Sequence, residues 1–103
     1  MEIKNLKKAA KRIEKAIIKK ERIILYGDGD LDGISSVIIL QEAIQSLGAK
    51  PSAVYFPDRE EEGYGLTETA LQKLKKLAPA LLITMDLGIS NFKEMLLAKK
   101  LGF

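Results

Sequence analysis

The sequence lacks cysteine and histidine, and both absences narrow its chemistry. Without histidine, the chain offers neither an imidazole base nor an imidazole metal ligand. The absence of cysteine fits a reducing compartment. No apolar run approaches the roughly 20 residues of a membrane span, and residues 1–22 are too rich in lysine for a signal peptide. We therefore expect a cytoplasmic protein that does not enter a membrane.

Charge is unevenly distributed along the 103 residues. At 47% hydrophobic and 30% charged residues, the composition is that of one small globular domain with a modest core. Residues 1–22 carry nine lysines and arginines against three glutamates, a net charge of +6. Residues 23–103 carry eight basic and eleven acidic residues, a net charge of −3. The basic excess is thus confined to residues 1–22.

The leading segment, residues 1–21, predicts an amphipathic basic helix over residues 2–20. Its apolar stripe comprises Leu6, Ala9, Ala10, Ile13, Ala16 and Ile17. Lysines occupy the remaining faces: Lys4, Lys7, Lys8, Lys11, Lys15 and Lys19. Two interpretations stay open, namely a solvated face on a helix that covers a sheet, or contact with a nucleic-acid backbone. Lysines without interleaved aromatic residues favour the first.

Residues 23–36, IILYGDGDLDGISS, organise the rest of the chain. The run 23–26 is typical of a buried strand, and apolar residues at helical spacing predict a helix over 34–47. Three aspartates stand at alternating positions between them: Asp28, Asp30 and Asp32. They are therefore predicted to lie in a strand-to-helix turn, at the carboxyl end of a strand, where open α/β sheets bind ligands.

Three carboxylates this close repel one another unless a cation compensates them. Oxygen ligands favour a hard ion such as Mg²⁺, Mn²⁺ or Ca²⁺. A solvated acidic turn is the simplest alternative. An EF-hand loop is a second, but counting from Asp28 its twelfth position is Ile39, where a bidentate glutamate is required.

Two further βα units follow, so that residues 22–103 contain three. Strands are predicted at 52–56 and 80–85, and Thr67 is a candidate cap for the helix after the polar loop 58–65. Right-handed crossovers then give a three-layer α/β/α fold with a parallel sheet, preceded by the basic helix. With the first strand at the centre, the other two flank it in the order 2-1-3. In that order Asp86, which follows the third strand, lies at the same edge as the first three aspartates.

Three segments resemble motifs of the DHH phosphoesterase family, in the family's order. Residues 24–36 (ILYGDGDLDGISS) resemble its first motif, and residues 86–91 (DLGISN) resemble its second. Residues 57–59 (PDR) and 62–66 (EGYGL) resemble the segment between them. The matches cover most of the three βα units and are most similar to the RecJ-type single-strand-specific exonucleases.

The resemblance implies hydrolysis of phosphodiester or phosphoanhydride bonds by two Mn²⁺ or Mg²⁺ ions. It implies metal-ligating and catalytic roles for Asp30, Asp32 and Asp86. Asp28 matches a position that is a metal ligand or a close neighbour of one. The implied substrate is single-stranded nucleic acid. Substrate contact is implied for four residues of the intervening segment: Arg59, Gly63, Tyr64 and Gly65.

The family's Asp-His-His motif lies on a strand that would follow this sequence. We therefore expect a truncated DHH domain over residues 1–103, with weak or absent activity in this chain alone. The alternative is a non-catalytic metal-binding or homo-oligomeric assembly module. A phosphoacceptor receiver domain is a third interpretation, but it requires functional residues on later strands. With no strand to cover residues 81–85, we also expect a homodimer paired through that edge.

Overall fold

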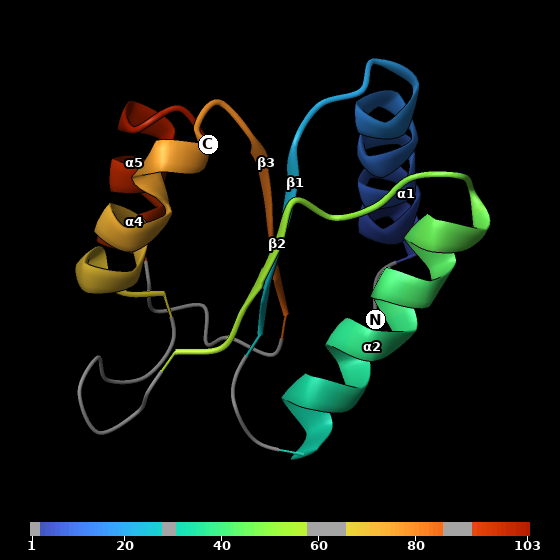
Figure 1. Cartoon of the computed structure of the whole chain (residues 1–103), viewed down its shortest axis with the longest axis horizontal. Coiled ribbons are helices and arrows are strands. Elements are labelled where there is room, and N and C mark those ends of the chain that lie inside the picture. The colour runs from blue at the N-terminus through green and yellow to red at the C-terminus, as the bar shows by residue number, and fades with distance from the viewer. Residues whose placement is uncertain (1–2, 28–30, 58–65, 86–91) are drawn as a thin grey trace.

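The computed structural model describes the backbone of residues 3–27, 31–57, 66–85 and 92–103, and side chains over 8–27, 33–57, 66–85 and 93–103. Its elements follow one another in the order drawn in Figure 1. They are α1 (Ile3–Ile18), β1 (Ile23–Gly27), α2 (Leu31–Ser46), β2 (Ala53–Tyr55), α4 (Glu68–Leu74), the 3₁₀ turn η1 (Lys75–Leu77), β3 (Leu81–Met85) and α5 (Phe92–Lys100).

The three strands form one parallel sheet in the order β2-β1-β3. On one side of β1, Leu25 is the register partner of Val54 in β2. On the other side, β1 and β3 are in register along their whole length, from Ile23–Leu81 to Gly27–Met85. This topology confirms the predicted order 2-1-3. The central strand is also the first, so the chain moves to one edge and then crosses to the other.

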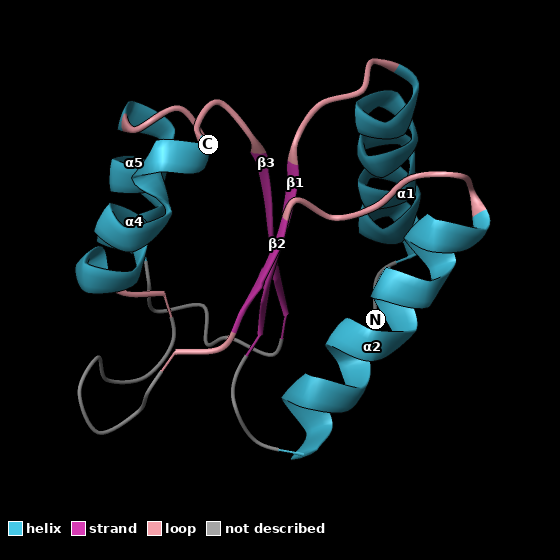
Figure 2. Ribbon diagram, in the orientation of Figure 1, coloured by secondary structure: helices cyan, strands magenta, loops and turns pink. Residues whose placement is uncertain are grey.

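Helices cover both faces of the sheet. Figure 2 shows α1 and α2 on one side of the strands and α4 and α5 on the other. Right-handed crossovers require this arrangement, because the step from β1 to β2 and the step from β2 to β3 run in opposite directions across the sheet. The predicted three-layer α/β/α architecture is therefore confirmed.

The core follows from the alternation of side chains along β1, all of whose residues are buried. Ile24 and Tyr26 point to the face covered by α4 and α5, where the Tyr26 ring stacks on Tyr55 with centroids 5.5 Å apart. Ile23 and Leu25 point to the opposite face, where they pack with Ala16 of α1 and with α2. Full burial of one such side chain contributes about 1.5–3 kcal/mol, and β1 buries four large side chains in this way.

The helix after the polar loop begins as its sequence predicts. Thr67 has extended backbone angles, and its hydroxyl oxygen accepts a hydrogen bond from the Ala70 amide at 3.2 Å. Leu71 and Leu74 are buried, and Leu77 is half-buried in the 3₁₀ turn that follows. The N-cap and the apolar spacing together place α4 on the sheet.

The apolar stripes of α1 and α2 differ from prediction. In α1, Ala16 is buried and Ile13 and Ile17 are half-buried, whereas Ala9 and Ala10 are exposed. Among the described side chains of α1, the buried stripe is therefore shorter than the predicted one. For the predicted helix 34–47 the apolar stripe is residues 34, 37, 38, 40, 44 and 47, but three of these are exposed, namely Ile34, Ile38 and Leu47, and Leu47 lies beyond the end of α2.

None of the helices in the described part of the chain is both long enough and apolar enough to cross a membrane.

Candidate metal centre

β1 and β3 end side by side. Gly27, the last residue of β1, is the register partner of Met85, the last residue of β3. In the sequence, Asp28 follows Gly27 directly and Asp86 follows Met85. The two aspartate-bearing segments thus leave the sheet from neighbouring positions at its carboxyl edge, the edge at which open α/β sheets bind ligands.

Helix α2 packs closely on the end of β1 at Gly27. A β-carbon at this residue would lie 2.5 Å from Cγ2 of Val37, 3.3 Å from the carbonyl oxygen of Gly33 and 3.5 Å from a ring carbon of Phe56. The absence of a side chain therefore lets the first turns of α2 approach the strand. Nothing in the sequence distinguishes this glycine from those of the turn, since Val37 lies ten residues away along the chain.

Asp32 is the one predicted ligand whose backbone the structure describes. It is the second residue of α2, which begins at Leu31. The prediction that all three aspartates precede the helix is therefore wrong for Asp32. The apolar periodicity starts only at Ile34, whereas the helix starts a turn earlier, and carboxylates in a first turn are favoured by the helix dipole.

The other predicted site residues lie outside the described residues. They are the candidate metal ligands Asp28, Asp30 and Asp86 and the candidate substrate contacts Arg59, Gly63, Tyr64 and Gly65. Within the described ranges, no cluster of three or more histidine, cysteine, aspartate or glutamate residues is placed to hold a metal.

The donor chemistry of the candidate site fits Mn²⁺ or Mg²⁺. Its four candidate ligands are carboxylates, and hard divalent cations take oxygen ligands. The sequence contains no histidine or cysteine that would favour a softer ion. A bound divalent ion would also relieve the repulsion between the carboxylates.

A charged pair ties α1 to the opposite, amino edge of the sheet. The Arg12 guanidinium donates hydrogen bonds to both Glu21 carboxylate oxygens, at 2.7 and 3.0 Å. These hydrogen bonds lower the pKa of Glu21 and raise the pKa of Arg12. The pair joins the third turn of α1 to the connection that enters β1, at the surface of the molecule.

The fold and the two adjacent strand ends define an open parallel α/β protein with a candidate divalent-metal site at the carboxyl edge of its sheet. The model of the DHH family, N-terminal domain, matches residues 22–103. The chain belongs to the DHH family.

Its relatives include single-stranded-DNA-specific exonucleases named RecJ. The chain is 43% identical to that of Bacillus subtilis over 101 residues, which are 98% of this chain and 13% of the relative. It is 38% identical to that of Thermus thermophilus over 94 residues, or 90% of this chain and 14% of the relative. The chain thus spans less than a fifth of the length of these relatives.

A solved structure supports the same relationship. The crystal structure of exonuclease RecJ bound to manganese matches with a TM-score of 0.83 at 31% identity, over 99% of this chain and 26% of that chain. The similarity includes the leading helix, because almost the whole chain is covered.

Proposed function

We propose that this chain supplies part of the metal site of a phosphodiesterase that acts on single-stranded nucleic acid. The observation that carries the proposal is the register pair Gly27–Met85, from which the two aspartate motifs leave the sheet together. The activity belongs to the complete RecJ-like architecture. Residues 1–21 act as a leading basic helix, and residues 22–103 form one partial DHH-type unit.

In this proposal, Asp28, Asp30, Asp32 and Asp86 hold Mn²⁺ or Mg²⁺. When bound, such ions lower the pKa of a water molecule and stabilise charge on the phosphoryl oxygens. Asp32 enters the site from the first turn of α2, whose approach to β1 depends on Gly27.

The substrate contacts come from the segment between β2 and α4. Arg59 binds a phosphate of the nucleic acid, because a guanidinium matches phosphate oxygens in geometry and charge. Gly63 and Gly65 let the backbone approach the substrate, with Tyr64 between them. This segment lies between Pro57 and Leu66, which are both buried and so anchor its two ends to the core.

A chimera tests the proposed activity. The matched segment of the Bacillus subtilis exonuclease is replaced by residues 1–103, which align with it over 98% of this chain. The chimera should release nucleotides from a labelled single-stranded oligonucleotide in Mn²⁺, and its Asp32→Ala variant should not. The matched control is Glu42→Gln, which removes an exposed carboxylate further along α2. A folded but inactive chimera rejects the proposed activity.

These 103 residues alone should release little or no nucleotide, because the four aspartates are the only ligands that they contribute to the site. Mn²⁺-dependent release that Asp32→Ala abolishes would show that the smaller site suffices.

The alternative function is a non-catalytic metal-binding and assembly module. It is favoured by the outer edge of β3, because in the described part of the chain this strand pairs only with β1. Two copies that pair through β3 would form a homodimer with a continuous six-stranded sheet. Metal binding and dimerisation together with an inactive chimera would support this alternative. A cytoplasmic location goes with either function.

A further inference from the structure

Three helices of this protein end in the same hydrogen-bonded motif, with one difference. In α2 and α5 the residue in left-handed conformation is glycine: Gly48 has φ +86° and Gly102 has φ +103°. In α1 the corresponding residue is Lys20, with φ +59°.

The hydrogen bonds of the three ends are equivalent. After α1, the Lys20 amide donates to the Ile17 carbonyl at 3.2 Å and the Glu21 amide to the Ala16 carbonyl at 2.9 Å. After α2, the amides of residues 48 and 49 donate to the carbonyls of residues 45 and 44. After α5, the amides of residues 102 and 103 donate to the carbonyls of residues 99 and 98. Each helix therefore ends in a Schellman motif, in which glycine is the preferred left-handed residue.

Lysine at residue 20 is unfavourable for the backbone, since a β-carbon disfavours the left-handed region and glycine does not. The helix dipole does not require it, because Lys19 supplies a cation in the same turn. Strain of this kind, in a chain that uses glycine at two equivalent positions, indicates a role for the side chain.

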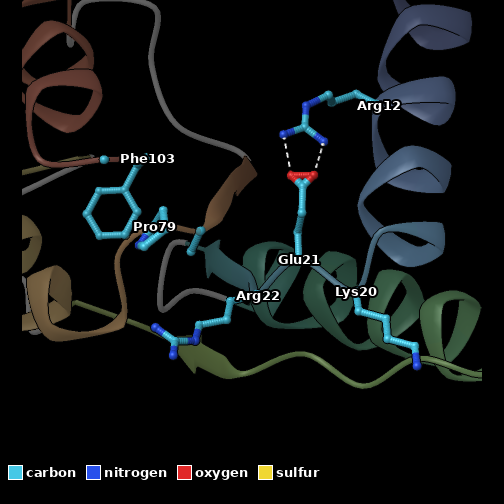
Figure 3. Close-up of a pocket in the computed structure, with 8 residues that line it drawn as sticks. Arg12, Lys20, Glu21, Arg22, Pro79 and Phe103 are labelled. Atoms are coloured by element: carbon cyan, nitrogen blue, oxygen red, sulfur yellow. Dashed lines mark hydrogen bonds and ion pairs between the residues drawn. The ribbon is translucent and has the colours of Figure 1, made fainter.

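Lys20 lines two adjoining pockets at the amino edge of the sheet, where the three helices end, and its side chain points away from the Phe103 ring (Figure 3). The first pocket, of about 450 Å³, is also lined by Arg12, Glu21, Arg22, Pro79 and Phe103 (Figure 3). The second, of about 380 Å³, shares Lys20, Glu21 and Arg22 and adds Lys50.

The side chains that line these pockets carry a net positive charge. Both carboxylate oxygens of Glu21 are bound by Arg12, so this pair is neutral as a unit. Lys20, Arg22 and Lys50 are exposed, and no ion pair is recorded for them among the described side chains. Arg22 also donates a hydrogen bond to the Leu77 carbonyl at 3.2 Å, which steadies its guanidinium beside the first pocket.

The first pocket combines two of these cations, Lys20 and Arg22, with an aromatic ring. Phe103 is half-buried there, beside Pro79, and Figure 3 shows the ring at the opposite side of the pocket from Arg12 and Glu21. Cations that bind phosphates next to an aromatic face that stacks a base are the usual elements of single-strand binding. Residues 1–22 contain basic residues but no aromatic one, so the sequence does not indicate this combination, in which the ring comes from the other end of the chain.

We propose that the amino edge of the sheet is a second contact site for single-stranded nucleic acid. Lys20, Arg22 and Lys50 bind phosphates, and Phe103 stacks against a base. The site lies at the other end of β1 from Gly27, about 13 Å away for a five-residue strand. The ligand, single-stranded nucleic acid, is the same as in the proposed function, but its binding at this edge does not depend on the metal site.

Binding of a labelled oligothymidylate, followed by fluorescence anisotropy in EDTA, tests the site apart from the metal centre. Lys20→Gly should weaken binding about fivefold at low salt and make the salt dependence of the affinity shallower. Its melting temperature should be equal to or above that of the parent, since glycine fits the left-handed position. The matched control is Lys8→Gln, which removes an exposed charge of α1 outside both pockets.

Two results would overturn the inference. The first is a Lys20→Gly variant that binds no more weakly than Lys8→Gln. The second concerns Phe103→Leu, which keeps apolar bulk and removes the aromatic face. It should weaken oligothymidylate binding about fivefold or more. If instead it binds normally, and polyglutamate binds the parent as well as the oligonucleotide does, the surface is a general polyanion site.

Discussion

Val37 of α2 packs against Gly27 at the end of β1, so closely that a β-carbon at residue 27 would lie 2.5 Å from the Val37 Cγ2 atom. Both residues are buried, and valine is stiff because it is branched at the β-carbon. The contact therefore sets the distance between the strand end and the helix that carries Asp32. It links the packing of the fold to the position of a candidate ligand.

Gly27→Ala should destabilise the protein by about 1–3 kcal/mol, since the added methyl group overpacks the contact. In a domain of this size the loss corresponds to a melting temperature lower by about 4–8 °C per kcal/mol. In a Val37→Ala background the same substitution should cost less, with a coupling energy of about 0.5 kcal/mol or more. A Gly27→Ala variant that melts at or above the parent temperature would contradict the argument.

The sheet order, the layers and the cap at Thr67 were predictable because each depends on a local pattern or on connection rules. The start of α2 was not predictable, because the apolar periodicity begins at Ile34 and does not indicate that Leu31 and Asp32 are helical. The Gly27–Val37 contact and the pocket that Phe103 and Arg22 both line were also beyond prediction, since both depend on residues that only the folded chain brings together.

Mn²⁺ should raise the melting temperature of the chain if the aspartates form one site. At a free concentration ten times the dissociation constant, the stabilisation is about 1.4 kcal/mol. The Asp30→Asn/Asp86→Asn double variant should lose this effect. Without metal, it should melt at or above the parent temperature, because two mutually repelling charges are gone. Scanning calorimetry with and without Mn²⁺ measures both.

Glu42→Gln is the control for the metal experiment, since it removes an exposed carboxylate of α2 and should leave the Mn²⁺ shift intact. An equal Mn²⁺ shift in the parent and in the double variant would mean that Asp30 and Asp86 do not share the site.

The Arg12–Glu21 pair should make stability depend on pH in the acidic range. Arg12 lowers the pKa of Glu21 in the folded state, so the unfolded state binds more protons there and stability falls as the pH falls. Glu21→Gln should therefore lower the melting temperature at neutral pH. The difference from the parent should shrink below the ordinary glutamate pKa of about 4.3 and vanish once Glu21 is protonated in both states.

Glu14→Gln serves as the control for the pH series. Glu14 is exposed on α1, the helix that carries Arg12, and forms no ion pair among the described side chains. Its melting temperature should follow that of the parent at every pH. A constant difference between Glu21→Gln and the parent across the acid range would assign the effect to packing instead of charge.

The outer edge of β3 should pair with a second copy of the chain. Such an edge is a template for association, and Leu81, Leu82 and Ile83 on it are half-buried apolar residues. The Leu81 amide donates to the Arg22 carbonyl at 2.8 Å, so it faces β1. By alternation, the amides of Ile83 and Met85 also face β1, whereas those of Leu82 and Thr84 face outward.

Thr84→Pro is therefore the substitution that tests the dimer. It removes an outward amide on an edge strand, where proline is tolerated, and leaves the pairing with β1 in place. Ile83→Pro would break the ladder to β1 and could not separate dimer loss from unfolding. Light scattering at micromolar concentration should give a dimeric mass for the parent and for Thr84→Val, which keeps the amide, and a monomeric mass for Thr84→Pro. A monomeric parent rejects the dimer. A dimeric Thr84→Pro variant places the interface on the helices, as exchange of α5 between copies would.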